Sequence, residues 1–456
     1  MERKGSSMFA TKIGAILAAA GSAVGLGNIW RFPTETGTNG GAAFILIYVL
    51  FMILFGVPIM VTEFAVGRYG NKDVTHSFLT MSDGKKWWKY MGLMPVVAGF
   101  LVLSYYAVVA GWTLYYAVVA ALDGFSGKEP HEYSEFFSSF ASDEVKPIVW
   151  LVVVVMFTAA IVALGVRRGI ERGARIMMPL LFVFIVVLVV CSMTLPGASQ
   201  GVDFLLRPDF SKVNGATVLS AMGQAFFSLS VGICCLCTYA CYFRKDVNLI
   251  HDGLSVAIID TLVALMAGFI IFPAVYSIPG LSPDAGPSLV FVTLPNVFQH
   301  AFGDVVWLSY IFSVLFYLLL VMAALTSSIS MLEMIVAFFH EEYRASRPLV
   351  AVLSSVACIC LGALCSLSFG SLSDVTLFGM TIFDFCDFLV AKLLMPAGSL
   401  LICVFAGWVV KRDNMYAELT NGGVVNRYVF PVYYAIIRYV APIGILLIFF
   451  NGLGLV

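Results

Sequence analysis

Charge is scarce in this sequence. Only 12% of the 456 residues are charged, and 26 basic residues against 27 acidic ones leave a net charge of −1. Without a basic excess or an acidic tail, the chain lacks the electrostatic footprint of a protein that binds nucleic acid or a polycation. A water-soluble globule is also excluded, because 61% of the residues are hydrophobic and the mean hydropathy is +0.96.

Other features are missing as well. No polar block separates the apolar runs, so a single membrane domain over residues 1–456 is predicted. The N-terminus, "MERKGSSMFATK", has no small-residue cleavage site and predicts an uncleaved signal anchor. None of the ten cysteines lies in a long polar loop, so neither a disulfide framework nor a metal cluster is expected. The expected partners are the lipid bilayer and a small molecule, without an obligate protein partner.

Segments of about 20 apolar residues are long enough to cross a bilayer. Eleven are predicted: roughly 13–37, 42–70, 88–122, 146–165, 173–195, 214–242, 252–279, 301–341, 348–370, 377–410 and 429–453. The loops on one side hold most of the lysines and arginines, whereas those on the other hold only Lys128, Lys146, Arg207 and Lys212. This asymmetry predicts a multi-pass protein of the cell inner (plasma) membrane, with the N-terminus cytoplasmic and the C-terminus outside.

Two spans look interrupted. The first carries "GSAVGLGNIWRFP" (21–33), and the sixth carries "AMGQAFFSLSVGICC" (221–235). Close helix packing explains small residues alone, but not Asn28, Arg31 and Pro33 directly after them. Breaks five spans apart are expected of transporters built from inverted repeats, here approximately 13–195 and 214–410, plus an eleventh helix at approximately 429–453. Freed carbonyls suit Na⁺ and freed N–H groups suit a carboxylate, so the breaks predict a site for both.

Polar side chains elsewhere in the spans support a cation site. Asp260 has no charged neighbour in its own span, and a bound Na⁺ would balance it. Thr326 and Ser327 are candidates for a second set of oxygen ligands, although hydroxyls in helices often bond only to the preceding turn. Lys392 follows Asp384 and Asp387 in span 10, and the pattern fits a structural ion pair and a gate equally well. Glu63, Arg68 and Glu333 are interpreted as structural.

At this point the motifs resemble a known family. "GSAVGLGNIWRFP", "NGGAAF", "GRYG", "GQAFFSLSVG", "TYACYFRKD" and "LTSS" together are similar to the neurotransmitter:sodium symporter family, over essentially the whole chain. The resemblance implies an all-α polytopic membrane protein with the LeuT-type fold, which has a 5+5 inverted repeat and broken first and sixth helices, in an eleven-helix form. It also implies alternating access, with the broken helices rocking against spans 3, 4, 8 and 9.

The resemblance further implies a site. The substrate would bind to Ala23, Leu26, Gly27, Val102, Tyr106, Phe227, Ser228, Ser230, Ile233, Ser327 and Met331. Two sodium ions are implied, the first held by Ala23, Asn28, Ser228 and Asp260, and the second by Gly21, Val24, Ala323, Thr326 and Ser327. Arg31 and Asp387 would form the external gate, and Tyr106 and Phe227 the lid over the substrate.

Two features of the sequence sharpen the expected substrate. Gly25 occupies the position where monoamine carriers of the family place an aspartate, so here the substrate should supply its own carboxylate, as an α-amino acid does. The apolar lining of Val102, Ile233 and Met331 favours hydrophobic L-amino acids, aliphatic or aromatic. Because Asp260 already supplies a negative charge near the first sodium, transport independent of chloride is predicted.

The chain departs from the family pattern at the cytoplasmic gate. The usual arginine falls at Ser6, so Arg3 or Lys4 would pair with Glu341 instead, and Phe9 stands where a Trp is usual. An enzyme is not favoured, because the sequence has no nucleophile–base pair, nucleotide loop or metal cluster. A sodium-dependent amino-acid sensor that binds without accumulating substrate remains the alternative to a symporter.

Overall fold

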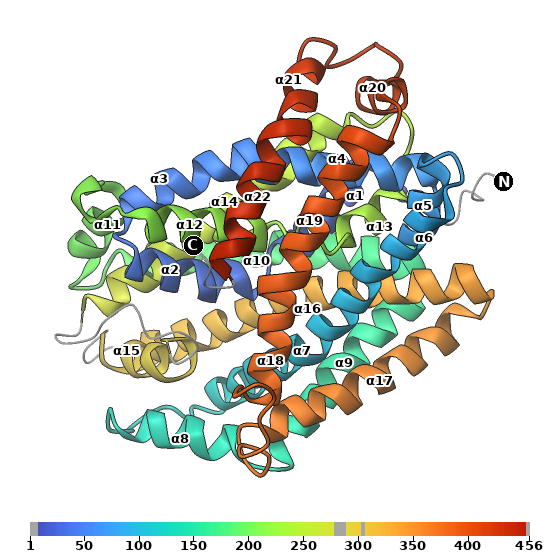
Figure 1. The fold of residues 1–456 in the computed structure, drawn as a ribbon. Coiled ribbons are helices and arrows are strands. Elements are labelled where there is room, and N and C mark those ends of the chain that lie inside the picture. The colour runs from blue at the N-terminus through green and yellow to red at the C-terminus, as the bar shows by residue number, and fades with distance from the viewer. Residues whose placement is uncertain (1–7, 278–288, 302–305, 453–456) are drawn as a thin grey trace.

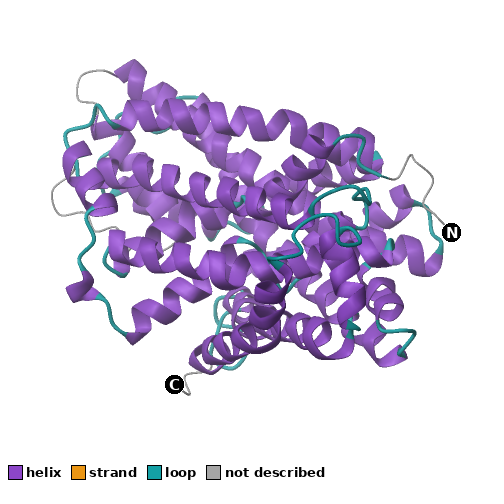
Figure 2. Ribbon diagram, turned by 90° about the horizontal axis from the view of Figure 1, so that it is seen from above, coloured by secondary structure: helices purple, strands orange, loops and turns teal. Residues whose placement is uncertain are grey.

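The computed structural model describes every residue except 1–7, 278–288, 302–305 and 453–456. Within those limits the chain is built from helices and loops, without a strand (Figure 2). This is the expected solution for a chain in hydrocarbon, because a helix satisfies its backbone hydrogen bonds within the segment.

Nine of the described helical segments are long and apolar enough to cross a membrane: Ala42–Gly70, Lys86–Ala121, Lys146–Ala163, Val166–Ser192, Leu249–Val275, Trp307–Tyr343, Arg347–Leu367, Ile382–Val409 and Phe430–Gly452. A tenth crossing is the pair Lys12–Ala23 and Gly27–Thr38, which bends by 54° at a break. The remaining predicted span is divided between α12 (Gly215–Ser228) and α13 (Cys235–Ala240), with residues 229–234 unwound between them.

The first crossing comprises α1 (Lys12–Ala23), η1 (Gly27–Arg31) and α2 (Phe32–Thr38), where η marks a short π or 3-10 helix. The other elements used below are α3 (Ala42–Phe51), α4 (Val57–Gly70), α7 (Leu93–Ala121), α9 (Lys146–Ala163), α10 (Arg172–Ser192), α14 (Leu249–Val275), α16 (Val306–Tyr343), α17 (Arg347–Leu367), α18 (Ile382–Phe388), η6 (Leu389–Leu394), α19 (Met395–Val404), α21 (Phe430–Ala435) and α22 (Ala441–Gly452).

Short helices lie at the two ends of the bundle. Figure 1 shows α5 (Val74–Met81) and α6 (Lys86–Met91) at one end, and α8 (Glu132–Ala141), α11 (Ala198–Leu206) and α15 (Leu294–Ala301) at the other. Helix α5 belongs to a loop predicted to be cytoplasmic, α6 begins at the end of that loop where the next crossing starts, and the last three belong to loops predicted to be outside. The order of the elements along the chain therefore agrees with spans that alternate in direction.

One predicted boundary is wrong. Span 10 was expected to begin near residue 377, but α18 begins at Ile382. Phe378 and Gly379 both have positive φ, 53° and 80°, which an α-helix cannot accommodate. The helix starts after Thr381, whose hydroxyl accepts a hydrogen bond from the backbone N–H of Asp384 at 3.2 Å.

Four helices, α7, α9, α16 and α17, pack against one another along their lengths (Figure 1). Small residues permit this close approach: a Cβ on Gly111 would lie 2.7 Å from the backbone N of Leu151, and one on Gly362 would lie 2.8 Å from the carbonyl of Ser104. The broken helices lie beside this group. Helix α1 contacts α10, α14 and α16, while α12 contacts α3 and α13 contacts α4.

Candidate substrate and sodium site

The break in the first span begins where α1 ends at Ala23. Val24 adopts an extended conformation, with φ −65° and ψ 113°, and the helix resumes at Gly27. The N–H groups of the break have side-chain partners: that of Gly25 donates to Asn28 Oδ1 at 3.0 Å, and that of Leu26 to the Tyr106 hydroxyl at 3.3 Å. Tyr106, on α7, therefore lies next to the N–H groups predicted to meet a substrate carboxylate.

The break in the sixth span contains residues with left-handed backbone conformation and donates a hydrogen bond to a buried acid. Ser230, Gly232 and Cys234 all have positive φ, at 52°, 92° and 56°. The N–H of Gly232 donates to Glu63 Oε1 at 2.8 Å, and Glu63 on α4 is buried. An unwound backbone in hydrocarbon survives only when such partners are supplied. Glu63, interpreted from sequence as structural, is a partner of the unwound segment.

The side chains predicted to hold the first sodium ion form one buried cluster. Asn28 Nδ2 donates to Asp260 Oδ1 at 2.8 Å and to Ser228 Oγ at 3.3 Å. Ser228 Oγ donates to Asp260 Oδ2 at 2.5 Å, and the Tyr48 hydroxyl donates to Ser228 Oγ at 3.2 Å. Asn28, Tyr48 and Asp260 are fully buried. A carboxylate surrounded by amide and hydroxyl groups offers the oxygen atoms that a hard cation prefers.

The residues predicted for the second sodium ion meet where α1 ends against α16. Ser327 Oγ donates to the Val24 carbonyl at 3.1 Å, and Thr326 Oγ1 lies 3.5 Å from the same oxygen. Thr326 Oγ1 also donates to the Ala323 carbonyl at 3.0 Å, and a Cβ on Gly21 would lie 3.3 Å from Thr326 Cβ. The hydroxyls thus contact the freed carbonyl of the first break as well as their own helix.

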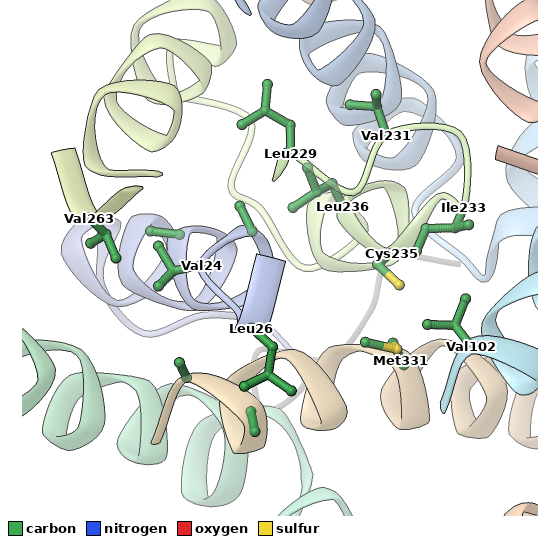
Figure 3. Packing of buried hydrophobic residues seen from close by; sticks show 14 of the residues in the cluster. Val24, Leu26, Val102, Leu229, Val231, Ile233, Cys235, Leu236, Val263 and Met331 are labelled. Atoms are coloured by element: carbon green, nitrogen blue, oxygen red, sulfur yellow. The ribbon is translucent and has the colours of Figure 1, made fainter. Parts of the chain in front are cut away.

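A cavity of about 370 Å³ lies between the two breaks and α7, α16 and α18. All eleven residues predicted to contact substrate line it. Figure 3 shows Val102, Ile233 and Met331 gathered together from α7, the unwound segment and α16. Each of these three is at most 7% exposed. The cavity therefore has an apolar wall on one side and the N–H groups of the first break on another.

The predicted gate residues also line this cavity. The Arg31 guanidinium lies 4.2 Å from the centre of the Phe227 ring, and its ion pair is with Glu35 at 3.7 Å. Asp387 lines the same cavity, but no ion pair with Arg31 is present in the described part of the chain. The gate formed by Arg31 and Asp387 stays a prediction.

Lys392 lines this cavity and a second one of about 200 Å³ between α12, η6, α19 and α22. Neither Asp384 nor Asp387 pairs with it among the described residues, and Asp384 Oδ2 instead accepts a hydrogen bond from Thr381 at 2.8 Å. The ion pair that the sequence left open as one alternative is therefore not formed in the described part of the chain.

Glu333, interpreted from sequence as structural, joins helices at the end of the bundle that carries α5 and α6. Glu333 on α16 accepts a hydrogen bond from the Tyr242 hydroxyl at 2.6 Å and forms an ion pair with Arg347 on α17. Phe9 packs edge-on against Tyr242, with ring centres 6.2 Å apart. Arg3, Lys4 and Ser6 lie outside the described residues, whereas Glu341 accepts a hydrogen bond from the backbone N–H of Asp73 at 2.8 Å.

The start of α1 is fixed by Glu171, which the sequence interpretation missed. Its carboxylate accepts hydrogen bonds from the N–H groups of Ala10 and Thr11 at 2.7 and 3.2 Å, and Arg175 pairs with it at 2.9 Å. Tyr48 was missed as well. An isolated Tyr in an apolar span is typical of a core residue, and the charged run around Glu171 resembles any cytoplasmic loop, so neither gave a signal of its own.

These observations define a class of protein: a polytopic membrane transporter whose first and sixth spans are broken beside a common cavity. The comparisons agree. The sequence matches the sodium:neurotransmitter symporter family over residues 6–130 and 137–454, and the chain belongs to this family. The family consists of transporters and not enzymes, and its sodium dependence makes this chain a sodium-coupled transporter that acts on a small molecule.

Relatives extend over the whole chain. A sodium-dependent transporter of Bacillus subtilis, YhdH, is 40% identical over 448 residues, or 98% of each chain. The sodium-dependent serotonin transporter of Drosophila melanogaster is 27% identical over 78% of this chain and 63% of its own length. Among solved structures, MhsT in complex with L-phenylalanine has a TM-score of 0.89 and 42% identity, covering 98% of this chain and 99% of that one. This likeness confirms the predicted LeuT-type fold.

Proposed function

We propose that this transporter imports hydrophobic L-amino acids, aliphatic or aromatic, together with two sodium ions, and that it does so without chloride. The observation that carries the substrate class is the packing of Gly25. A Cβ at this position would lie 2.6 Å from Ser327 Oγ and 3.2 Å from the Tyr106 hydroxyl. No side-chain carboxylate can stand there without displacing these groups, so the substrate must bring its own.

The cavity supports the rest of the substrate assignment. The amino acid's carboxylate would meet the N–H groups of Leu26 and Gly27 with the Tyr106 hydroxyl, and its side chain would lie against Val102, Ile233 and Met331. Burial of apolar surface rewards a larger side chain by about 25 cal/mol per Å². MhsT, which is similar over the whole chain, was solved with L-phenylalanine.

The two sodium ions would occupy the two oxygen-rich clusters. The first site consists of Ala23, Asn28, Ser228 and Asp260, and the substrate carboxylate would complete it. The second consists of Gly21, Val24, Ala323, Thr326 and Ser327. Because Asp260 is buried beside Asn28 and Ser228, its fixed charge supports transport that does not need chloride as a further anion.

Alternating access would follow from the arrangement of the helices. The broken helices contact the group formed by α7, α9, α16 and α17 but are separate from it, which suits two bodies that rock about a shared site. The distribution of basic residues supports a cytoplasmic N-terminus in the plasma membrane, with the C-terminus outside.

The substrate class is tested by competition. Proteoliposomes under an inward sodium gradient take up labelled L-phenylalanine, and unlabelled leucine, tyrosine, alanine, aspartate and phenethylamine are added in turn. We expect competition from leucine and tyrosine, weak competition from alanine, and none from aspartate or from phenethylamine, which lacks a carboxylate. Equal competition by phenethylamine would overturn the argument from Gly25. Sodium-dependent binding without accumulation would instead identify a sensor.

A further inference from the structure

An apolar groove of about 490 Å³ opens on the outside of the bundle between α7, α16 and α17. It is separate from the substrate cavity, with which it shares no lining residue. Val97, Phe339 and Leu353 line it and are 47%, 39% and 59% exposed. The groove is therefore open on the outer surface of the helices. In a membrane-spanning bundle this surface faces the hydrocarbon of the bilayer.

The groove is lined by aromatic rings from α16 and by smaller side chains from α17. Rings line the α16 side, where Phe339 and Tyr343 stack with centres 5.8 Å apart. The α17 side is lined by Val350, Leu353, Ser354 and Ala357, none of which carries a ring. If the groove stayed empty, the rings that line it would have no dispersion contacts on that side. A flexible apolar chain that enters the groove supplies these contacts and is stabilised by them.

The mouth of the groove carries unpaired positive charge. Arg344 stands between two lining residues, Tyr343 and Ala345; it is exposed and has no ion pair among the described residues. Lys86, at the start of α6, is likewise exposed and unpaired within the described chain, and it precedes by one helical turn Lys89, which contacts Glu342 next to the lining residue Tyr343. The neighbouring Lys89 does not add to this charge, because Glu342 pairs with it at 2.6 Å.

Aromatic side chains at the same end mark the height of the lipid headgroups. Trp87 and Tyr90 on α6 are 65% and 69% exposed, and Tyr343 is 67% exposed. Trp and Tyr gather where hydrocarbon meets water, and basic residues beside them attract anionic lipids. The groove thus runs from hydrocarbon to a cationic rim.

We propose that this groove binds one anionic phospholipid, with an acyl chain against α16 and α17 and the headgroup phosphate at Arg344 and Lys86. A second copy of the chain fits less well, because a two-fold contact centred on the groove would bring the cations of both copies together. The occupant would lie behind the substrate site, since Ile335 of the groove is one helical turn from Met331 of the cavity.

The experiment is native mass spectrometry of the full chain, released from vesicles with equal amounts of phosphatidylglycerol and phosphatidylcholine. We expect one phosphatidylglycerol to remain bound to the unaltered protein. Ala357→Trp fills the groove and should abolish retention, whereas Val356→Trp, at an exposed position beside it that does not line the groove, should not. All variants are first checked for sodium-dependent binding of L-phenylalanine, which shows that they are folded.

The contribution of the Arg344 charge to lipid binding is tested separately. Arg344 has φ 55°, a left-handed conformation that Asn tolerates, so Arg344→Asn removes the cation without adding strain. We expect about a fivefold loss of preference for phosphatidylglycerol over phosphatidylcholine. Arg427→Asn, at an exposed cation in the loop before α21 that does not line the groove, should leave that preference unchanged. Equal retention of both lipids by the unaltered protein, retention by Ala357→Trp, or displacement of the lipid by inorganic phosphate alone would overturn the proposal.

Discussion

The side-chain amide of Asn28 donates a hydrogen bond to Asp260 Oδ1 over 2.8 Å, although the two residues are 232 positions apart. This contact joins the break of the first span to the middle of α14. Replacing Asp260 by Asn removes the only carboxylate of the cluster while nearly keeping its size. We expect the sodium concentration for half-maximal uptake to rise at least about tenfold, because a cation loses a buried counter-charge.

Chloride makes the Asp260→Asn prediction sharper. If the loss of negative charge causes the weaker sodium dependence of the variant, chloride should partly restore its uptake. Uptake by the unaltered protein should not respond to chloride. Asp252→Asn is the matched control, since Asp252 lies on the same helix but its carboxylate faces His251 at 3.3 Å. An Asp260→Asn variant that behaves like the unaltered protein with and without chloride would contradict the assignment.

Ser327 and Ser328 provide a matched pair for the second cluster. Ser327 Oγ donates to the Val24 carbonyl of the break, whereas Ser328 Oγ donates to the Ala324 carbonyl of its own helix. Ser327→Ala should therefore lower sodium-dependent uptake by about tenfold or more, because one of the oxygen ligands is lost. Ser328→Ala should leave uptake within about twofold. Equal effects of the two substitutions, measured as initial uptake rates at several sodium concentrations, would refute a special role for Ser327.

Gly25 and Gly223 form a matched pair, because a Cβ would be too close to other atoms at Gly25 but would meet open space at Gly223. A Cβ on Gly25 would lie 2.6 Å from Ser327 Oγ, but one on Gly223 of α12 would meet nothing within 4 Å. Gly25→Ala should abolish measurable L-phenylalanine binding, since the space for its carboxylate is taken. Gly223→Ala should retain binding and gain about 0.5–1 kcal/mol of stability from helix propensity. Binding of L-phenylalanine by Gly25→Ala with unchanged affinity would count against the predicted carboxylate position.

Glu63 tests how the unwound part of the sixth span is held. Glu63→Ala leaves the buried N–H of Gly232 without its partner, which should cost about 1–3 kcal/mol of stability. Glu63→Gln keeps an acceptor oxygen and should lose less. Thermal unfolding in detergent measures both variants, and a Glu63→Ala variant that unfolds at the temperature of the unaltered protein would show that another group serves Gly232.

The fold was readable from local patterns, but much of the site was not. Gly21 to Pro33 interrupts an apolar span within a few residues, and such a break is visible in the sequence alone. The oxygen cluster is different, because Tyr48, Ser228 and Asp260 come from three distant spans and only the family resemblance brought two of them together. No local pattern indicates which of several buried acids faces a break.

The contacts at the end of the bundle that carries α5 and α6 show the same limit. Glu333 and Arg347 are 14 residues apart across a turn between α16 and α17, and Tyr242 reaches Glu333 from the sixth span. The pairing of Glu341 with Arg3 or Lys4 stays a prediction, because both cations lie outside the described residues. Pairing between helix ends depends on how the helices cross, which periodicity does not fix.

The most direct test of the account is accumulation of labelled L-phenylalanine in proteoliposomes with an imposed inward sodium gradient, repeated with potassium in place of sodium and with gluconate in place of chloride. The account predicts concentrative uptake that requires sodium, is unchanged without chloride and collapses when the sodium gradient is dissipated. Uptake that persists in potassium, or that disappears when chloride is removed, would contradict it.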